Sequence, residues 1–327
     1  KVSRYGQVLA RTDGTRKFPW RILGISRKDK DLLTNQLSYL LADTCRIQDP
    51  TWIKPGKVAW DWWNAWNLKG VDFETGVNNK TYEYYIDFAA KNGLEYIIMD
   101  EGWSDPFDLF LLTPEIDVKQ VIDYAETKGV KEILWCVWHT LDRQMAPALD
   151  LFEEWGVAGI KVDFIDRDDQ DAINFYERLA RESAKRKLLV DYHGCSKPTG
   201  LSRTYPNVVN YEGVMGNEYN KFSTQTSPGH DVDIVFTRMA AGPIDYTPGA
   251  MRNSTEGNFH MDNENTMSPG TRCHQLGMYV VYYAPLQMLC DAPTAYEAEP
   301  EVLSMITDVP TTWDDTRAFC AGYRFLV

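Results

Sequence analysis

Residues 132–164, EILWCVWHTLDRQMAPALDLFEEWGVAGIKVDF, contain one strand–helix–strand unit. The two end segments, 132–138 and 159–164, are short and nearly continuously apolar, which is typical of parallel strands buried on both faces. A short helix is expected at 151–155, just before the second strand. Parallel neighbours need a crossover connection of this kind, so the stretch favours an α/β fold.

The same alternation continues outward from this unit over most of the chain. Further strands are predicted at residues 57–63, 94–99, 188–192 and 208–211. Helices are predicted at 82–92, over 118–128 up to Gly129, and at 171–185. Additional strands are expected at 233–236 with 242–246, and at 278–283. About eight β units favour a closed (β/α)8 barrel, a TIM barrel, over an open sheet.

The two ends of the chain differ from this pattern. Residues 18–26 are predicted to form a lone strand and residues 31–41 a helix that leads into the barrel. After Ala292 the chain becomes polar, and a short strand is expected at 323–327. The sequence therefore divides into a leading segment (1–54), a barrel (55–300) and a trailing segment (301–327), with both ends belonging to neighbouring domains.

Composition narrows the class of ligand. The net charge of −13 argues against nucleic acid and against an anionic membrane surface, because both require basic groups. No apolar run reaches 18 residues, so membrane insertion is not expected. The chain has eleven Trp and eighteen Tyr. Aromatic rings stack on the C–H faces of sugars, so this number favours a carbohydrate ligand, but an aromatic-rich core explains it equally well.

Acidic and aromatic side chains gather where the predicted strands end, which in an α/β barrel is a single rim. The rim candidates are Asp61, Trp62, Asp100, Trp138, His139, Lys161, Asp163, His193, Glu212 and, in the loop beyond, Glu218. Any one acid here is explained equally well as a helix N-cap. The repetition over six strands favours a functional rim.

Two carboxyl groups on such a rim suit glycoside hydrolysis. The reaction needs a nucleophile or base on one side of the scissile bond and a proton donor on the other. Asp163 is the best nucleophile candidate, because it lies two residues after Lys161 and points to the same side of the strand. A lysine there can keep the carboxylate ionised and bind sugar hydroxyls, or it can be part of a structural ion pair.

Four motifs resemble the catalytic barrel of glycoside hydrolase family 97. They are VAWDWWNAWN (58–67), LEYIIMDEGW (94–103), GIKVDF (159–164) and NYEGVMGNE (210–218), in this order along the chain. The KVD pattern is also similar to that of related α-galactosidase families. The resemblance covers roughly residues 52–313.

This resemblance implies a retaining exo-acting α-galactosidase with Asp163 as nucleophile and Glu218 as general acid/base. Inverting members of the family are expected to have glutamates where this chain has His139 and Gly194, so both positions favour retention. The alternatives are a β-L-arabinopyranosidase or an inverting α-glucosidase of the same family, and a non-catalytic carbohydrate-binding barrel.

The resemblance further implies Ca²⁺ bound by Glu212 and Glu218, and an oligosaccharide or other glycoside as substrate. The residues expected to hold the sugar are Asp61, Trp62, Asp100, Trp138, His139, Lys161 and His193. Residues 1–54 would be the last strand and linker of an N-terminal β-sandwich, and 301–327 the start of a C-terminal β domain. A periplasmic or secreted bacterial protein is expected, with its signal peptide outside this chain.

Overall fold

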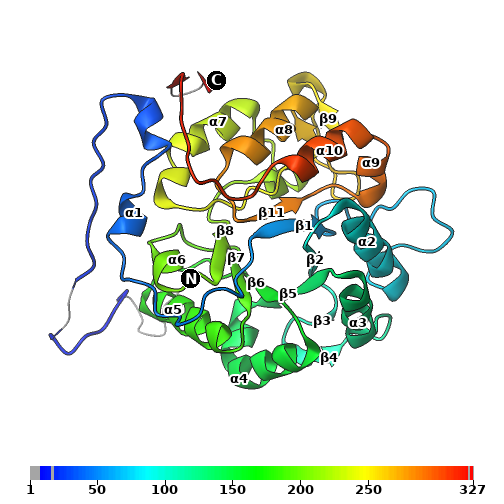
Figure 1. Ribbon diagram of the computed structural model, residues 1–327, viewed down its shortest axis with the longest axis horizontal. Coiled ribbons are helices and arrows are strands. Elements are labelled where there is room, and N and C mark those ends of the chain that lie inside the picture. The colour runs from blue at the N-terminus through cyan, green and yellow to red at the C-terminus, as the bar shows by residue number, and fades with distance from the viewer. Residues whose placement is uncertain (1–7, 16–17, 323–324, 327) are drawn as a thin grey trace.

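The computed structural model describes residues 8–15, 18–322 and 325–326. Seven parallel strands form one sheet in the order β11–β1–β2–β5–β6–β7–β8, so the strand of this sheet that comes last along the chain lies beside the one that comes first. The strands are β1 (Gly56–Trp60), β2 (Tyr96–Met99), β5 (Lys131–Val137), β6 (Gly159–Asp163), β7 (Leu189–Tyr192), β8 (Val208–Tyr211) and β11 (Leu286–Leu289). Helices surround the sheet (Figure 1), which confirms the α/β barrel.

Helices follow the strands on the outside of this barrel (Figure 1). The longer ones are α2 (Asn79–Asn92), α3 (Val118–Lys128), α4 (Trp138–Trp155), α5 (Gln170–Lys185), α7 (Pro228–Phe236), α8 (Arg272–Val281) and α10 (Pro300–Asp308). Gly93, Gly129 and Gly156 end α2, α3 and α4 in the left-handed conformation that glycine adopts at no steric cost. The shorter helices are α1 (Leu37–Leu40), α6 (Leu201–Thr204) and α9 (Pro293–Glu297).

The eighth position of the barrel is occupied by an irregular segment, residues 243–248, called here the closing segment. The Asp245 amide donates to the Tyr211 carbonyl of β8, and the Cys290 amide after β11 donates to the Pro248 carbonyl. Regular pairing fails here because proline has no N–H to donate and because Thr247 has a φ of +60°. The segment therefore closes the barrel without forming a strand.

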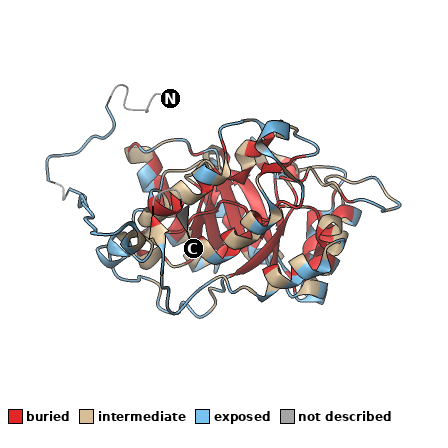
Figure 2. Cartoon of the chain, turned by 90° about the horizontal axis from the view of Figure 1, so that it is seen from above, coloured by how far each residue is buried: buried red, intermediate tan, exposed pale blue. Residues whose placement is uncertain are grey.

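Two apolar layers hold the barrel together. The interior is filled by side chains such as Val58, Trp60, Ile133 and Met288, and a larger layer lies between the strands and the surrounding helices. Figure 2 shows the buried barrel strands at the centre, with most of the exposed surface on the helices and loops around them. This rigid core fixes the direction in which each strand end presents its side chains.

The C-terminal third differs from the sequence prediction. The predicted strands at 233–236 and 278–283 are wrong, because these residues belong to α7 and to α8 with the residues that follow it. The side chains of Ser227 and Thr271 accept hydrogen bonds from the third residue of each helix, so both segments begin as capped helices. Strand β11 was not predicted, and residues 242–246 fall at the eighth barrel position without strand pairing.

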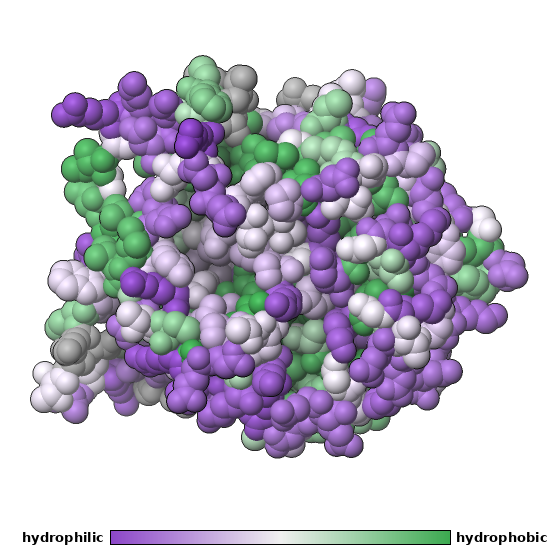
Figure 3. Space-filling view, in the orientation of Figure 1, coloured by the Kyte–Doolittle hydropathy of each residue, from purple (hydrophilic) through white to green (hydrophobic). Residues whose placement is uncertain are grey.

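The chain before β1 is extended and exposed. The strand predicted at 18–26 is absent, and residues 31–41 contain only the end of a 3-10 turn (Asp29–Leu32) and the short α1 instead of one helix. Phe18, Trp20, Leu23 and Ile25 are each more than 80% exposed. The segment lies along the left edge in Figure 1, where Figure 3 shows apolar surface.

Smaller elements complete the described chain. A hairpin of β3 (Ser104–Asp105) and β4 (Asp108–Leu112) follows β2, and β9 (Asn253–Ser254) pairs with β10 (Ser268–Pro269). Of the strand predicted at 323–327, only β13 (Phe325–Leu326) can be described, paired with β12 (Ala321–Gly322); residues 323–324 and 327 lie outside the described part. Among the described residues, the helices are all too short or too polar to cross a bilayer.

Candidate active site

A buried ion pair stands at the centre of the barrel mouth. The Lys161 ammonium on β6 lies 2.7 Å from Oδ2 of Asp100, which follows β2, and 3.7 Å from Oε1 of Glu218. Its Nζ also lies 4.5 Å from the centre of the Trp60 ring, whose Nε1 donates to Asp100 at 2.7 Å. The ends of the first, second and fourth barrel strands and the loop after β8 thus meet at one lysine.

Asp163 ends β6 on the same side of the strand as Lys161, as predicted. Its Oδ2 accepts a hydrogen bond from Nε1 of Trp135 on β5 at 3.1 Å. Burial raises the pKa of the Asp163 carboxyl, while the nearby charges of His193 and Lys161 lower it again. The Phe164 amide donates to its other oxygen, Oδ1, at 2.5 Å, and a carboxylate oriented by two donors and partly balanced by two cations is suited to nucleophilic attack.

Gly194, directly after His193, leaves room for this carboxylate. A Cβ on Gly194 would lie 2.8 Å from the Phe164 amide nitrogen and 3.0 Å from Asp163 Oδ1. Its φ of +49° is also unfavourable for other residues. The backbone of β7 therefore approaches Asp163 so closely that residue 194 can carry no side chain without displacing it.

His193 connects two sets of carboxylates. Its Nε2 lies 2.6 Å from Asp245 Oδ2 and 3.6 Å from Asp191, while its Nδ1 lies 3.5 Å from Glu218 Oε1 and 3.9 Å from Glu212 Oε2. The ring is fully buried. Burial lowers the pKa of His193, but Asp191 and Glu212 outweigh that effect and raise it well above the usual value.

Glu212 and Glu218 titrate as a coupled pair. Burial and the Glu218 charge raise the pKa of Glu212 to about 8. Burial also raises the pKa of Glu218, but Lys161 and His193 together reverse the effect and bring it to about 2. Burial and the Glu218 charge therefore favour the neutral form of Glu212, whereas the neighbouring cations favour the ionised form of Glu218.

The same pair fits part of a calcium site. Oxygens of Glu212 and Glu218 lie within 4.8 Å of each other and of a His193 ring nitrogen. Calcium prefers carboxylate and carbonyl oxygens and takes six to eight of them, so the two glutamates suit the ion and the imidazole does not. The raised pKa of Glu212 reflects an excess of negative charge that a divalent cation would balance.

Two predicted sugar-binding residues face other side chains. Asp61 is fully buried, and its Oδ2 accepts hydrogen bonds from Tyr82 Oη at 2.7 Å and Trp66 Nε1 at 3.0 Å, so it points toward α2. Trp62 is half-buried, its ring stacked 5.9 Å from Trp60 with Lys221 Nζ 4.7 Å from its centre. Neither contacts the Asp163 and Glu218 side chains directly among the contacts described.

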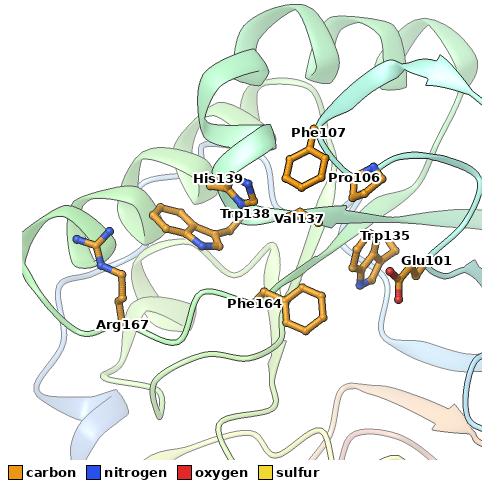
Figure 4. A pocket seen from close by; sticks show the side chains of 9 residues that line it. All are labelled: Glu101, Pro106, Phe107, Trp135, Val137, Trp138, His139, Phe164 and Arg167. Carbon is orange, nitrogen blue, oxygen red and sulfur yellow. The ribbon is translucent and has the colours of Figure 1, made fainter. Parts of the chain in front are cut away.

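Trp138 and His139 begin α4 instead of ending a strand, and they line a cavity beside Asp163. This cavity of about 430 Å³ lies between the β3–β4 hairpin and the loop after β6, as Figure 4 shows. Its other lining residues are Glu101, Pro106, Phe107, Trp135, Val137, Phe164 and Arg167. The Arg167 guanidinium lies over the Trp138 ring at 5.6 Å, so that ring already has a partner.

A second hollow of about 530 Å³ has Glu212, Gly194 and Tyr219 among its lining residues. Arg167 borders both spaces. Asp163 and Glu218 themselves line neither space; Trp135, which donates to Asp163, lines the first, and Glu212 lines the second.

Asp245 and Trp135 were missed by sequence reasoning although both contact predicted site residues. Trp135 lies inside an apolar strand, where nothing distinguishes it from a core residue. Asp245 had a usable signal: the IDY of 244–246 repeats the apolar–Asp–Tyr pattern of VDY at 190–192, which ends β7. An acid in this pattern at the eighth barrel position belongs to the same rim.

Comparisons with known proteins agree with this geometry. The sequence profile of glycoside hydrolase 97 matches residues 62–214. A "Retaining alpha-galactosidase" of Bacteroides thetaiotaomicron is 51% identical over 319 residues, which is 96% of this chain and 48% of that protein. A "Probable retaining alpha-galactosidase" of Streptomyces bingchenggensis is 32% identical over 94% of this chain and 46% of its own length. The chain spans about half the length of these relatives.

Solved structures give the same result. A glycoside hydrolase family 97 enzyme from Pseudoalteromonas sp. strain K8, solved with acarbose, superposes with a TM-score of 0.79 at 31% identity, covering 91% of this chain and 50% of that one. A β-arabinopyranosidase structure has a TM-score of 0.74 at 23% identity, which supports the fold alone. On sequence and fold, the chain belongs to glycoside hydrolase family 97.

Proposed function

We propose that the chain is the catalytic barrel of a retaining α-galactosidase that removes terminal α-galactosyl groups from oligosaccharides or other glycosides. The observation that carries the proposal is Asp163, a carboxylate at the end of β6 whose space depends on the absence of a side chain at Gly194. The relatives named as retaining α-galactosidases support the choice of sugar.

The reaction is a double displacement. In the first step an Asp163 oxygen bonds to the anomeric carbon, the bond to the leaving oxygen breaks, and Glu218 gives that oxygen its proton. In the second step Glu218 takes a proton from water, the water oxygen bonds to the anomeric carbon, and the bond to Asp163 breaks. Lys161 and Asp100, paired at 2.7 Å, are placed to bind the sugar hydroxyls between these two groups.

The ionised Glu218 of the described structure is the form that the second step requires. The first step requires its protonated form. A sugar hydroxyl that binds Lys161 competes with its 3.7 Å contact to Glu218, and loss of that contact raises the affinity of Glu218 for a proton. Substrate binding and protonation of the acid/base are coupled in this way.

We further propose that Glu212 and Glu218 hold Ca²⁺, which would orient Glu218 and neutralise the charge of the pair. The Gly194 amide donates to Glu212 at 2.7 Å and fixes that ligand. Terbium luminescence sensitised by nearby aromatic residues reports the ion directly: signal that calcium displaces is expected, and Glu212→Gln should weaken it. Terbium binding that is unchanged in the variant would contradict the site.

The nucleophile is tested by azide rescue. Asp163→Ala should lose nearly all turnover of nitrophenyl α-galactoside and regain part of it with azide, giving the β-configured galactosyl azide that attack on the vacated face requires. Rates on the matching nitrophenyl β-L-arabinopyranoside, which lacks only the C6 hydroxymethyl group, decide between the two sugars. An unaffected variant, or inversion of configuration by the unsubstituted chain, would overturn the retaining mechanism.

A further inference from the structure

A buried series of polar contacts runs from Asp245 through His193 to Glu218. The Asp245 carboxylate lies 2.6 Å from Nε2 of His193, and the opposite ring nitrogen lies 3.5 Å from Glu218. We propose that Asp245 is a positioning residue, which holds the His193 ring so that its Nδ1 faces Glu218 and keeps this carboxyl directed at the leaving oxygen. The inference rests on the proposed function, because it concerns the acid/base of that reaction.

Two backbone hydrogen bonds hold residue 245 in the position that this role requires. The Asp245 amide donates to the Tyr211 carbonyl at the end of β8, and the preceding Ile244 amide donates to the Tyr283 carbonyl. The Asp245 side chain is about 1% exposed, so water does not compete for His193. A carboxyl group carried by a backbone that these two bonds hold in place can determine the orientation of the ring and keep a proton on Nε2.

The neighbouring acids do not duplicate this contact. Asp191 lies 3.6 Å from the same ring nitrogen, and neither of its carboxylate oxygens has a hydrogen bond. Gly194, beside His193, instead donates to Glu212. Asp245 is therefore the group among the described residues that fixes Nε2, which leaves Nδ1 directed at the acid/base pair.

A second Asp–His pair in the chain provides a matched control. Nε2 of His274 on α8 lies 3.1 Å from Asp231 on α7, and Asp231 is equally well buried. None of the described contacts of His274 involves Lys161, Asp163 or Glu218. Asp231→Asn thus makes the same change in a second Asp–His pair, with a buried aspartate and a histidine side chain 25% exposed, that does not reach the acid/base.

The test uses two α-galactosides that differ only in leaving group. A nitrophenolate leaves with little need for a proton, whereas an alkoxide such as methoxide needs a general acid. Asp245→Asn is expected to lower kcat/KM, which reports the first step, at least about 10-fold more on methyl α-galactoside than on the nitrophenyl substrate. Asp231→Asn should change the two rates equally. Equal losses in Asp245→Asn would overturn the role.

A second measurement does not depend on turnover. In protein labelled with ¹⁵N-histidine, a His193 Nε2–H bonded to Asp245 should give a far-downfield proton signal, assigned by its loss in His193→Gln. The signal should shift in Asp245→Asn and stay in Asp231→Asn. Its absence from the unsubstituted protein would refute the proposal even if the Asp245 variant does not fold. Failure of the proposed function can be told apart from failure of the Asp245 role, because in the first case the unsubstituted chain would hydrolyse neither substrate.

Discussion

Lys161 and Asp100 form an ion pair inside the barrel mouth, with Nζ 2.7 Å from Oδ2 and both side chains at most 3% exposed. A pair this deeply buried is costly to break, because the remaining partner keeps its charge without compensation. The same lysine contacts Glu218, so the pair is at once a structural element of the barrel and a part of the site.

Lys161→Met should therefore lower the free energy of unfolding by about 3–5 kcal/mol and abolish measurable turnover. Urea denaturation measures the first effect. Lys91→Met provides the comparison, since Lys91 pairs with Glu297 at 3.2 Å but is 70% exposed, and its loss should cost less than about 1 kcal/mol. Similar small losses in both variants would show that the Lys161 charge is not effectively buried.

Gly194→Ala should impair catalysis far more than folding. The new methyl group would meet the Asp163–Phe164 backbone and the Asp163 carboxylate, so we expect kcat to fall at least about 100-fold through misplacement of the nucleophile. Gly277→Ala in α8 meets no atom within 4 Å and should stabilise the helix by about 0.5–1 kcal/mol, with kcat retained. A fully active Gly194→Ala would mean that Asp163 does not occupy this space during the reaction.

Phe164→Ala should weaken binding of the leaving group. The Phe164 ring is 49% exposed, contacts Trp135 edge-to-face at 6.0 Å and lines the cavity next to Asp163. Loss of an aromatic contact of about 0.5–1.5 kcal/mol predicts a roughly two- to tenfold higher KM for galactosyl disaccharides. Phe110→Ala on β4, 45% exposed, is the control. A KM unchanged in both variants would place the leaving group elsewhere.

Asp61 should make stability fall as the pH rises through neutrality. Burial and the Asp100 charge raise its pKa to about 7, so the folded protein binds a proton that the unfolded chain releases near pH 4. Protonated Asp61 stabilises the fold fully at a pH below its pKa in the unfolded chain. This stabilisation, on the order of 4 kcal/mol in all, is lost as the pH rises through the pKa of Asp61 in the folded protein. Urea titrations from pH 4 to 8 should show this slope, and Asp61→Asn should flatten it.

Sequence patterns predicted the first two thirds of the barrel well, for a physical reason. Parallel strands buried on both faces are apolar throughout, and helices that end at Gly93, Gly129 or Gly156 have a local stop signal. In the last third the apolar runs at 233–236 and 278–283 lie within buried helices or directly after one, where a short run cannot be told from a strand.

The site residues likewise divide into those that a local sequence pattern could predict and those that it could not. Asp163 and Lys161 could be predicted to face one side, because strand geometry fixes side-chain direction at a spacing of two residues. The direction of the Asp61 side chain could not be predicted, because it depends on hydrogen bonds from Tyr82 and Trp66. The contact between His193 and Asp245 joins residues 52 positions apart across an irregular part of the barrel, which no local pattern encodes.

The closing segment is a part of the barrel wall that is held by few backbone hydrogen bonds. Two of its six residues, Pro243 and Pro248, have no amide proton, and the segment adds few cross-strand bonds to β8 and β11. Local opening should therefore begin here, at a lower free energy than unfolding of the seven paired strands. Amide deuterium uptake should reach Tyr246 and Thr247 before the adjoining strands, whereas the hydrogen-bonded amides of Ile244 and Asp245 should exchange later.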